Sequence, residues 1–146
     1  MRRNLSFAIV MCLAAAAAAE DKAAVTPKAL QAKYSAAVEK HVKRESKKTG
    51  AFQVPDDVLK KEWPLALKRI HKDRIVSLGE GKFFACADFK EKGGKKTDLD
   101  LDFYVSKQGD AWIVDRVLVH KVSGVARYTY NDNNERVPIQ TVDTAR

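Results

Sequence analysis

The sequence predicts an α+β fold in which one long N-terminal helix packs on a curved antiparallel sheet, a meander of about four to five strands. Two patterns lead to this prediction. Apolar residues recur at helical spacing over residues 27–49, and apolar and polar residues alternate strictly over Asp98–Ser106. Each pattern leaves one apolar face, and the two faces are most simply buried against each other.

Residues 1–19 are typical of a secretory signal peptide. Arg2 and Arg3 give a positive start, an apolar run follows, and Ala14–Ala19 offers an Ala-x-Ala cleavage site. We expect cleavage near Ala19 and therefore a secreted or periplasmic protein, with an uncleaved interfacial helix as the alternative. No segment reaches the roughly 18–20 apolar residues that a membrane span needs.

Residues 20–130 are expected to form a single α+β domain, followed by a polar, flexible tail over residues 131–146. The formal net charge of +8 at pH 7 favours an anionic envelope component or a protein partner. Nucleic acid is not expected as a partner of a secreted protein, no cofactor is predicted, and a homodimer formed through the sheet is compatible with the pattern. Cys86 is the single thiol after the signal segment, and its apolar neighbours predict a buried, unreactive side chain.

The long helix is predicted from Pro27 to Thr49. Thr26 supplies a hydroxyl N-cap, Pro27 suits the first helical position, and Gly50 is a natural stop. The apolar stripe of this helix consists of Leu30, Tyr34, Ala37, Val38 and Val42. The cations of its last turns, which complement the helix dipole, are Lys43, Arg44, Lys47 and Lys48.

The segment after the helix is open to two interpretations. Phe52 and Val54 predict a strand that ends at Pro55 and a turn at Asp56-Asp57, and a second strand would run from Trp63 to His71. In the alternative, residues 57–63 form a short helix that Asp56 caps. The sequence alone leaves both open.

Three further strands are predicted, joined by glycine-containing connections. Arg74–Leu78 leads through Gly79-Glu80-Gly81 to these strands, which are Lys82–Lys90, Asp98–Ser106 and Trp112–Val122. Gly109 marks the turn between the last two. Ser123-Gly124 predicts a bend or bulge, after which Val125–Tyr130 continues the pairing.

In this order the elements resemble the cystatin-like and nuclear-transport-factor-like group of folds, in which a helix lies in a curved antiparallel sheet. Three sequence blocks are also similar to those of small secreted bacterial proteins of unassigned function, namely Ala85–Phe89, Leu99–Phe103 and His120–Tyr130. The resemblance implies a fold and a compartment. It carries no catalytic residue to this chain, because such folds host enzymes, ligand binders and inhibitors alike.

Asp98, Asp100 and Asp102 lie on one face of their predicted strand, where like charges repel unless a cation compensates them. A hard metal ion such as Ca²⁺ is one solution. Pairing with cations of the next strand is simpler, and the candidates there are Arg116, His120 and Lys121. We therefore predict no metal site.

His120 is the candidate general base, if Asp88, Asp100 or Asp102 orients it. The alternative is a structural histidine that bonds to a carboxylate or to the backbone. A second candidate site is an amphipathic recognition patch, for which the binding residues are Asp88, Lys121, Arg127, Tyr128 and Tyr130.

These features favour a non-enzymatic secreted binding or interaction module that uses the concave sheet face or the patch on the terminal strand. The first alternative is a small hydrolase- or isomerase-type enzyme that uses His120 with an aspartate. The second is a cystatin-style inhibitor or a subunit of an envelope complex. No catalytic motif decides between them.

Overall fold

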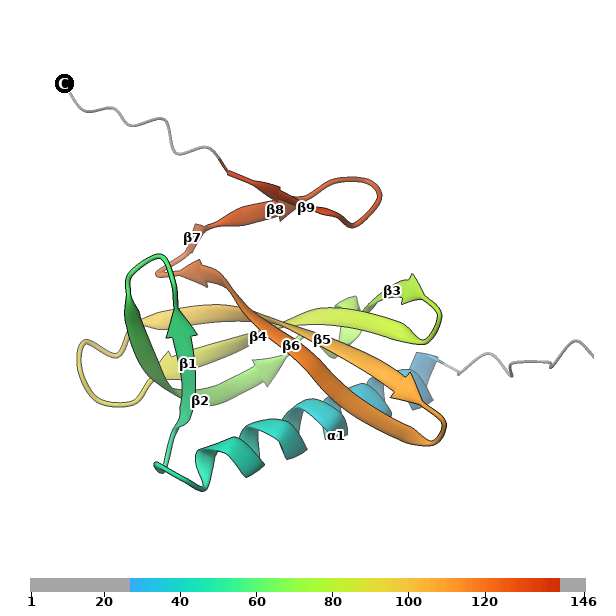
Figure 1. The fold of residues 1–146 in the computed structure, drawn as a ribbon, viewed down its shortest axis with the longest axis horizontal. Helices are drawn as coiled ribbons and strands as arrows, with labels where there is room; N and C mark the ends of the chain where they lie inside the picture. Colours follow the sequence, from blue (N-terminus) through green and yellow to red (C-terminus); the bar gives the residue numbers. More distant parts are fainter. Residues whose placement is uncertain (1–26, 140–146) are drawn as a thin grey trace, which may run out of the picture.

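The computed structural model describes residues 27–139, which form one helix packed against a strongly curled antiparallel sheet (Figure 1). The elements are α1 (Pro27–Ser46), β1 (Phe52–Asp56), β2 (Lys61–Ile70), the 3-10 turn η1 (Lys72–Arg74), β3 (Val76–Gly79), β4 (Lys82–Glu91), β5 (Asp98–Gln108), β6 (Ala111–Val122), β7 (Val125–Ala126), β8 (Tyr128–Tyr130) and β9 (Arg136–Pro138). The predicted α+β class is confirmed. The main sheet has seven strands rather than four to five.

The predicted signal segment 1–19, the predicted cleavage site near Ala19 and the predicted N-cap Thr26 lie outside the described residues, as does the end of the chain from residue 140. Within residues 27–139, no helix is long and apolar enough to cross a membrane.

Helix α1 ends at Ser46, three residues before the predicted end. The Ser46 hydroxyl donates to the backbone oxygen of Val42 at 2.7 Å and so competes with the backbone for the acceptors of the last turn. Residues 47–49 form a turn instead. Gly50, at φ +78°, then closes the helix by donating its N–H to Ser46 at 2.8 Å.

The sheet curls around the helix. The strands follow the order β1-β2-β4-β5-β6-β7, and β3 pairs with the same strand, β4, as β2 does. In a flat sheet β1 and β6 would lie about 19 Å apart, at about 4.8 Å per strand. Helix α1 nevertheless contacts β1, β5 and β6, so the two ends of the sheet approach each other around it (Figure 1).

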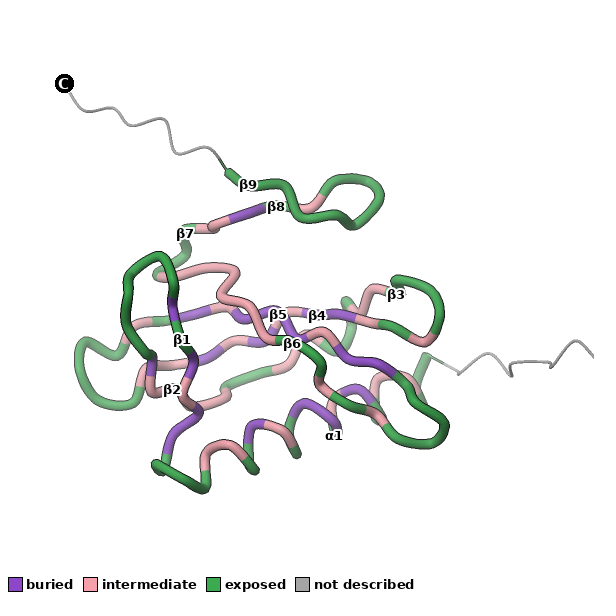
Figure 2. Tube along the Cα trace, viewed as in Figure 1, coloured by how far each residue is buried: buried purple, intermediate pink, exposed green. Residues whose placement is uncertain are grey.

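The core lies between α1 and the inner face of the sheet, where the purple segments of α1, β4 and β5 face each other in Figure 2. The inward side chains of β5 are all buried, as the alternation predicts, and they are Leu99, Leu101, Phe103 and Val105. Tyr34 on α1 is fully buried, and its hydroxyl donates to the backbone oxygen of Phe103 at 2.7 Å. The helix is thereby fixed to the central strand by a polar contact as well as by apolar burial.

Residues 57–60 form a turn, so the alternative of a short helix over residues 57–63 is wrong. Asp56 explains why the segment resembles a helix start. Its Oδ1 accepts the backbone N–H groups of Val58 and Leu59, both at 3.0 Å, as an N-cap would. Lys60 has φ +52°, and β2 begins at the next residue and pairs back on β1.

The expected tail from residue 131 is wrong for residues 136–138. They form β9, which pairs with β8 in a separate two-stranded sheet (Figure 1). Asn131 stabilises the connecting turn, because its Oδ1 accepts the backbone N–H groups of Asn133 and Glu135 at 3.0 Å. This hairpin crosses the face of the main sheet that is opposite α1.

An ion pair ties the start of this hairpin to the β1–β2 turn. The two terminal guanidinium nitrogens of Arg127, Nη1 and Nη2, donate to the carboxylate of Asp56 at 2.6 and 2.7 Å, and the Trp63 indole donates to it at 2.8 Å. Burial of the carboxyl opposes its ionisation, but the hydrogen bonds from Arg127 and Trp63 outweigh burial and hold the pKa of Asp56 well below its usual range. Arg127 is therefore a structural residue in this fold.

Replacing Arg127 by alanine should lower the free energy of unfolding by about 2–3 kcal/mol, because Asp56 would stay buried without its cation. Urea denaturation followed by circular dichroism measures the change. Arg74→Ala is the matched control, since Arg74 is 78% exposed and pairs with an equally exposed Asp73. Its effect should stay within about 0.5 kcal/mol. Equal losses in the two variants would contradict the assigned role.

The same pair predicts a pH dependence of stability. In the unfolded chain Asp56 titrates near 3.8, whereas in the folded chain its pKa is lower. Below about pH 4 the unfolded state therefore binds a proton that the folded state does not, and the free energy of unfolding falls. Arg127→Ala removes most of the difference between the folded and unfolded pKa values of Asp56. The difference in free energy of unfolding between wild type and variant should therefore become smaller as the pH falls from about 6 to about 3. A constant difference would contradict the prediction.

Candidate functional site

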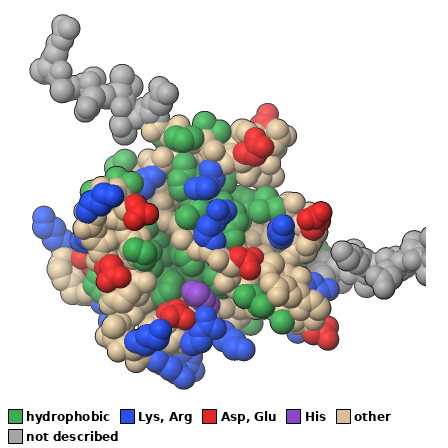
Figure 3. All heavy atoms as spheres, viewed as in Figure 1, with side chains coloured by type: hydrophobic (Ala, Val, Ile, Leu, Met, Phe, Trp, Pro, Cys, Tyr) green, Lys and Arg blue, Asp and Glu red, His purple; other side chains and the backbone are tan. Residues whose placement is uncertain are grey.

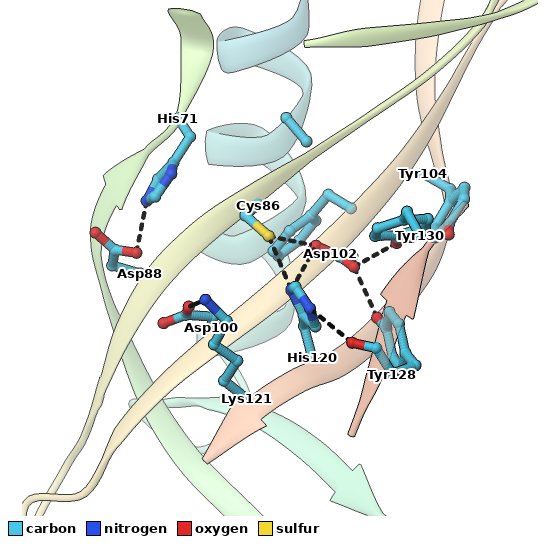
Figure 4. A network of polar contacts seen from close by, with 12 residues as sticks. His71, Cys86, Asp88, Asp100, Asp102, Tyr104, His120, Lys121, Tyr128 and Tyr130 are labelled. Carbon is cyan, nitrogen blue, oxygen red and sulfur yellow. Dashed lines mark hydrogen bonds and ion pairs between the residues drawn. The ribbon is translucent and has the colours of Figure 1, made fainter. Parts of the chain in front are cut away.

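A buried aspartate organises the polar cluster on the outer face of the sheet (Figure 4). Asp102 is 0% exposed. Its Oδ2 accepts hydrogen bonds from the hydroxyls of Tyr128 at 2.7 Å and Tyr130 at 2.5 Å. Its Oδ1 accepts a hydrogen bond from the thiol of Cys86, with 2.5 Å between Sγ and Oδ1. A carboxylate removed from water in this way needs such donors, because an unpaired charge there would be strongly destabilising.

Strand alternation and one bulge place these side chains together. Cys86 on β4 lies opposite Asp102 on β5, and both point away from the helix. On β6 the register shifts, because Asp100 pairs with Lys121 but Leu101 pairs with Val119. His120 is the extra residue of this bulge and points to the same face as Lys121. Without the bulge, alternation would send one of these two side chains into the core.

The imidazole of His120 is engaged on both nitrogens. Its Nε2 lies 3.1 Å from the backbone oxygen of Tyr128, which can only accept, so Nε2 carries the proton. Its Nδ1 lies 3.2 Å from the sulfur of Cys86 and 3.7 Å from Oδ1 of Asp102. The ring also stacks on Tyr128, with a centroid distance of 4.8 Å, and the side chain is 13% exposed.

Aromatic rings close the cluster toward solvent. Tyr130 packs on Phe84 at 4.7 Å between ring centroids, and Phe84 stacks on Tyr104 at 5.3 Å. Tyr130 donates to Asp102, so the contact of 3.1 Å between the two hydroxyls has Tyr104 as the donor to Tyr130. The guanidinium of Arg116 lies over the Tyr104 ring. The β8 strand thus covers the Asp102 cluster with a small second core.

The thiol and the two tyrosine hydroxyls that bond to Asp102 keep their protons. Burial and, second, the negative charge of Asp102 raise the pKa of the Cys86 thiol. Burial followed by the interaction with Asp102 also raises the pKa values of Tyr128 and Tyr130. All three groups therefore remain hydrogen-bond donors at neutral pH, and Cys86 is not an activated nucleophile.

A second, more exposed group lies next to the cluster on the same face. Asp88 pairs in register with Asp100, so two carboxylates lie side by side. His71 Nε2 contacts Asp88 at 2.6 Å and Arg69 donates to it at 3.3 Å, while Lys121 lies 3.4 Å from Asp100. Arg69 and Lys121 are the cations that compensate these carboxylates across the strands.

The structure separates the residues that the sequence grouped as one site. His120 and Asp102 come together, whereas Asp100 pairs with Lys121 and Asp88 pairs with His71. Tyr128 and Tyr130 bond to Asp102 instead of forming an open recognition patch, and Arg127 lies away from them on Asp56. α1 and the core fill the concave face of the sheet, and Asp102 and His120 lie on the opposite face.

The sequence analysis missed the part played by His71, Arg69 and Asp56. His71 and Asp88 are 17 residues apart, and they meet because η1 interrupts the β2–β3 segment where it runs along β4. The backbone N–H of His71 donates to the backbone oxygen of Cys86 at 2.9 Å, and this bond fixes the position of His71. The pairing of β2 with β4, which sets Arg69 opposite Asp88, brings these residues together, and no local pattern in the sequence indicates it.

The structure holds a surface groove at the opening of the curled sheet. Its volume is about 450 Å³, and its lining includes Phe52 and Val54 of β1 together with Val114 and Val117 of β6. A second groove of about 450 Å³ continues between α1 and β6. The two share His41 and Val114 and so lie next to each other along the helix, and together they are called the seam groove below.

Asp102→Ala should lower the free energy of unfolding by about 2–4 kcal/mol, because the Cys86 thiol and two tyrosine hydroxyls would lose their acceptor. Asp98→Ala is the matched control on the same strand face, where the side chain is 70% exposed. Its cost should stay within about 0.5 kcal/mol. Urea titration in the presence of a metal chelator measures both. Similar costs would contradict the central role of Asp102.

Comparison of the chain with protein-family models, with curated proteins and with solved structures found no match. The resemblance to cystatin-like and nuclear-transport-factor-like folds therefore stays a prediction. The curled sheet, the covered Asp102 cluster and the seam groove are the observations from which a function can be proposed.

Proposed function

We propose that the mature chain is a secreted or periplasmic, non-enzymatic binding module whose seam groove holds an extended acidic and apolar peptide segment of a partner protein. The observation that carries this proposal is the position of the groove between two strand edges. The signal-like pattern of residues 1–19 supports the compartment.

The strand edges beside the groove have room for another strand. β1 stands at the end of the sheet and pairs only with β2 in the described part of the chain. β6 pairs on its outer side with β7, which covers only Lys121 and Val122. The remaining edge of β6, residues 111–119, offers unpaired backbone groups beside the groove. Such an edge binds an extended segment by backbone hydrogen bonds, and neighbouring pockets select its side chains.

The groove has an apolar floor and a basic wall. Apolar side chains of β1 and β6 line the floor. The wall is the exposed face of α1, and Figure 3 shows Lys and Arg side chains gathered at the lower edge of the molecule over this helix. Lys33 and Lys40 line the groove and form no ion pair among residues 27–139. They are available to carboxylates of a bound segment.

Two of the three acidic groups that line the groove are already engaged, and the third, Asp110, forms no ion pair among residues 27–139. Glu45 is held by Arg44 at 2.9 Å and Lys48 at 3.7 Å, and Asp115 accepts a hydrogen bond from Ser106 at 3.0 Å. Burial lowers the pKa of His41, so this imidazole is neutral at pH 7 and lies edge-on against Phe52 as part of the floor. Among the groove residues without an ion pair, Lys33 and Lys40 outnumber Asp110, so the remaining charge is net positive and favours an acidic segment.

The Asp102 cluster supports binding rather than catalysis. Both ring nitrogens of His120 are engaged, and Tyr128 stacks on the ring. A general base must reach the proton that it removes, whereas Nδ1 of His120 faces Cys86 and Asp102 inside the covered cluster. The enzyme alternative is therefore the less supported of the two.

Fluorescence anisotropy of a labelled decapeptide of alternating glutamate and valine tests the proposal. We expect saturable binding that weakens as salt is added, and at least about tenfold weaker binding of the lysine–valine decapeptide, which is about 1.4 kcal/mol. The double variant Lys33→Glu/Lys40→Glu should weaken binding of the acidic peptide by about tenfold or more. Lys68→Glu/Lys72→Glu, the matched charge change on β2 and η1, should leave it unchanged.

Amide chemical shifts locate the peptide independently of affinity. Binding should perturb residues 52–55 of β1 and 111–117 of β6, and should leave the outer face around Asp102 unperturbed. Equal binding of the two peptides, or shifts confined to another surface, would overturn the proposal. A concentration-dependent dimer with the same shifts and no peptide effect would identify a second copy as the occupant instead.

A further inference from the structure

We propose that Cys86, Asp102 and His120 form a binding site for one Zn²⁺ ion on the outer face of the sheet. The ligand atoms would be Sγ of Cys86, Oδ1 of Asp102 and Nδ1 of His120, all within 4.8 Å of one another. This site is independent of the seam groove, since no ligand residue lines it.

The three atoms lie close enough to reach one ion, and Sγ and Oδ1 move apart when it binds, because ligand atoms of a tetrahedral zinc ion lie about 3.5 Å from each other. Sγ lies 2.5 Å from Oδ1 and 3.2 Å from Nδ1, and Oδ1 and Nδ1 are 3.7 Å apart. Zinc binds sulfur at about 2.3 Å and nitrogen or oxygen at about 2.0–2.2 Å. An ion slightly above the plane of the three atoms reaches all of them at about these distances. Three protein ligands leave a fourth tetrahedral position for water.

The histidine is held as zinc-binding histidines are held. Its Nε2–H donates to the backbone oxygen of Tyr128 at 3.1 Å. This bond fixes the tautomer in which Nδ1 carries the lone pair, and it orients that lone pair toward Sγ of Cys86 and Oδ1 of Asp102. Metal-binding histidines typically make such a bond from the nitrogen that does not bind the metal.

The carboxylate is oriented in a similar way. The hydroxyls of Tyr128 and Tyr130 both bond to Oδ2 of Asp102 and leave Oδ1 turned toward the sulfur and the imidazole. Tyr104 donates in turn to Tyr130. This is a complete outer shell around an aspartate ligand, and outer-shell partners of this kind tune the affinity of metal sites.

Charge supplies an independent reason for a cation here. Asp102 is fully buried, and among residues 27–139 it has no Lys or Arg partner in an ion pair. When Zn²⁺ binds, a zinc–sulfur bond replaces the S–H bond of Cys86 and the thiol proton leaves to water. The dication then meets one thiolate, one carboxylate and one neutral imidazole, so the buried charges balance.

The ligand set selects zinc over the hard cations. Ca²⁺ and Mg²⁺ take oxygen ligands, whereas a set of one sulfur, one nitrogen and one oxygen suits Zn²⁺. The sequence analysis predicted no metal because it considered only the aspartate row. The bulge that turns His120 outward and the strand pairing that sets Cys86 opposite Asp102 assemble a different set.

Titration of the reduced, chelator-treated full chain with Zn²⁺ and with Co²⁺ tests the site. We expect one equivalent of either ion per chain. Bound Co²⁺ should show a thiolate-to-cobalt charge-transfer band and the intense visible bands of a tetrahedral centre, and Zn²⁺ should abolish both. Zn²⁺ should also raise the melting temperature of the wild type. These readouts use the wild type and do not depend on whether a variant folds.

Variants then assign the ligands. Cys86→Ser and His120→Gln should each weaken Zn²⁺ binding by more than about 100-fold, and Tyr130→Phe by about tenfold. His71→Gln is the matched control, because His71 also contacts an aspartate on the outer face but lies outside the proposed site. Circular dichroism checks that each variant is folded.

Two results would overturn the proposal. One is a folded wild type that binds no stoichiometric Zn²⁺, which would leave the three residues as a hydrogen-bonded network. The other is Co²⁺ binding without the thiolate band, or with unchanged affinity in Cys86→Ser, which would place the ion elsewhere on the chain.

Discussion

The central strand β5 is covered on both faces, and the rest of the structure depends on this double cover. Helix α1 buries one face through Leu99, Leu101 and Phe103, as an amphipathic strand requires. The β8 strand buries part of the other face, which carries Asp102. Because that aspartate cannot be solvated, the neighbouring strands must supply donors, and the Cys86–Asp102–His120 cluster is the result.

The double cover also separates two kinds of surface. The outer face under β8 is closed, hydrogen-bonded and aromatic, and it suits a small ion that side chains can enclose. The opening of the curled sheet, where β1 and β6 approach α1, is open and basic and suits an extended segment. The Arg127–Asp56 pair joins the hairpin of the first surface to the β1–β2 turn beside the second.

Local patterns predicted the elements that have a regular period or a strong terminator. The stripe from Tyr34 to Val42 predicted α1, and the alternation in Asp98–Ser106 predicted β5, because each needs only the residue spacing. Val125–Tyr130 was predicted to continue the pairing of the main sheet, but only β7 does so. β8 pairs instead with β9, which was missed because it is three residues long and follows a polar turn. A strand as short as β8 is stabilised by the surface that it covers, which is Phe84 and Tyr104 in this protein.

The sequence by itself determined the fold class, the inward face of β5 and the presence of unusual polar residues on its other face. The tertiary structure alone decided which of them meet. A strand period cannot show that a bulge turns His120 outward, that Cys86 lies opposite Asp102, or that two tyrosines fold back over both. These contacts join residues 16 to 34 positions apart, and their geometry depends on register and sheet curl, which are set by packing among many residues at once.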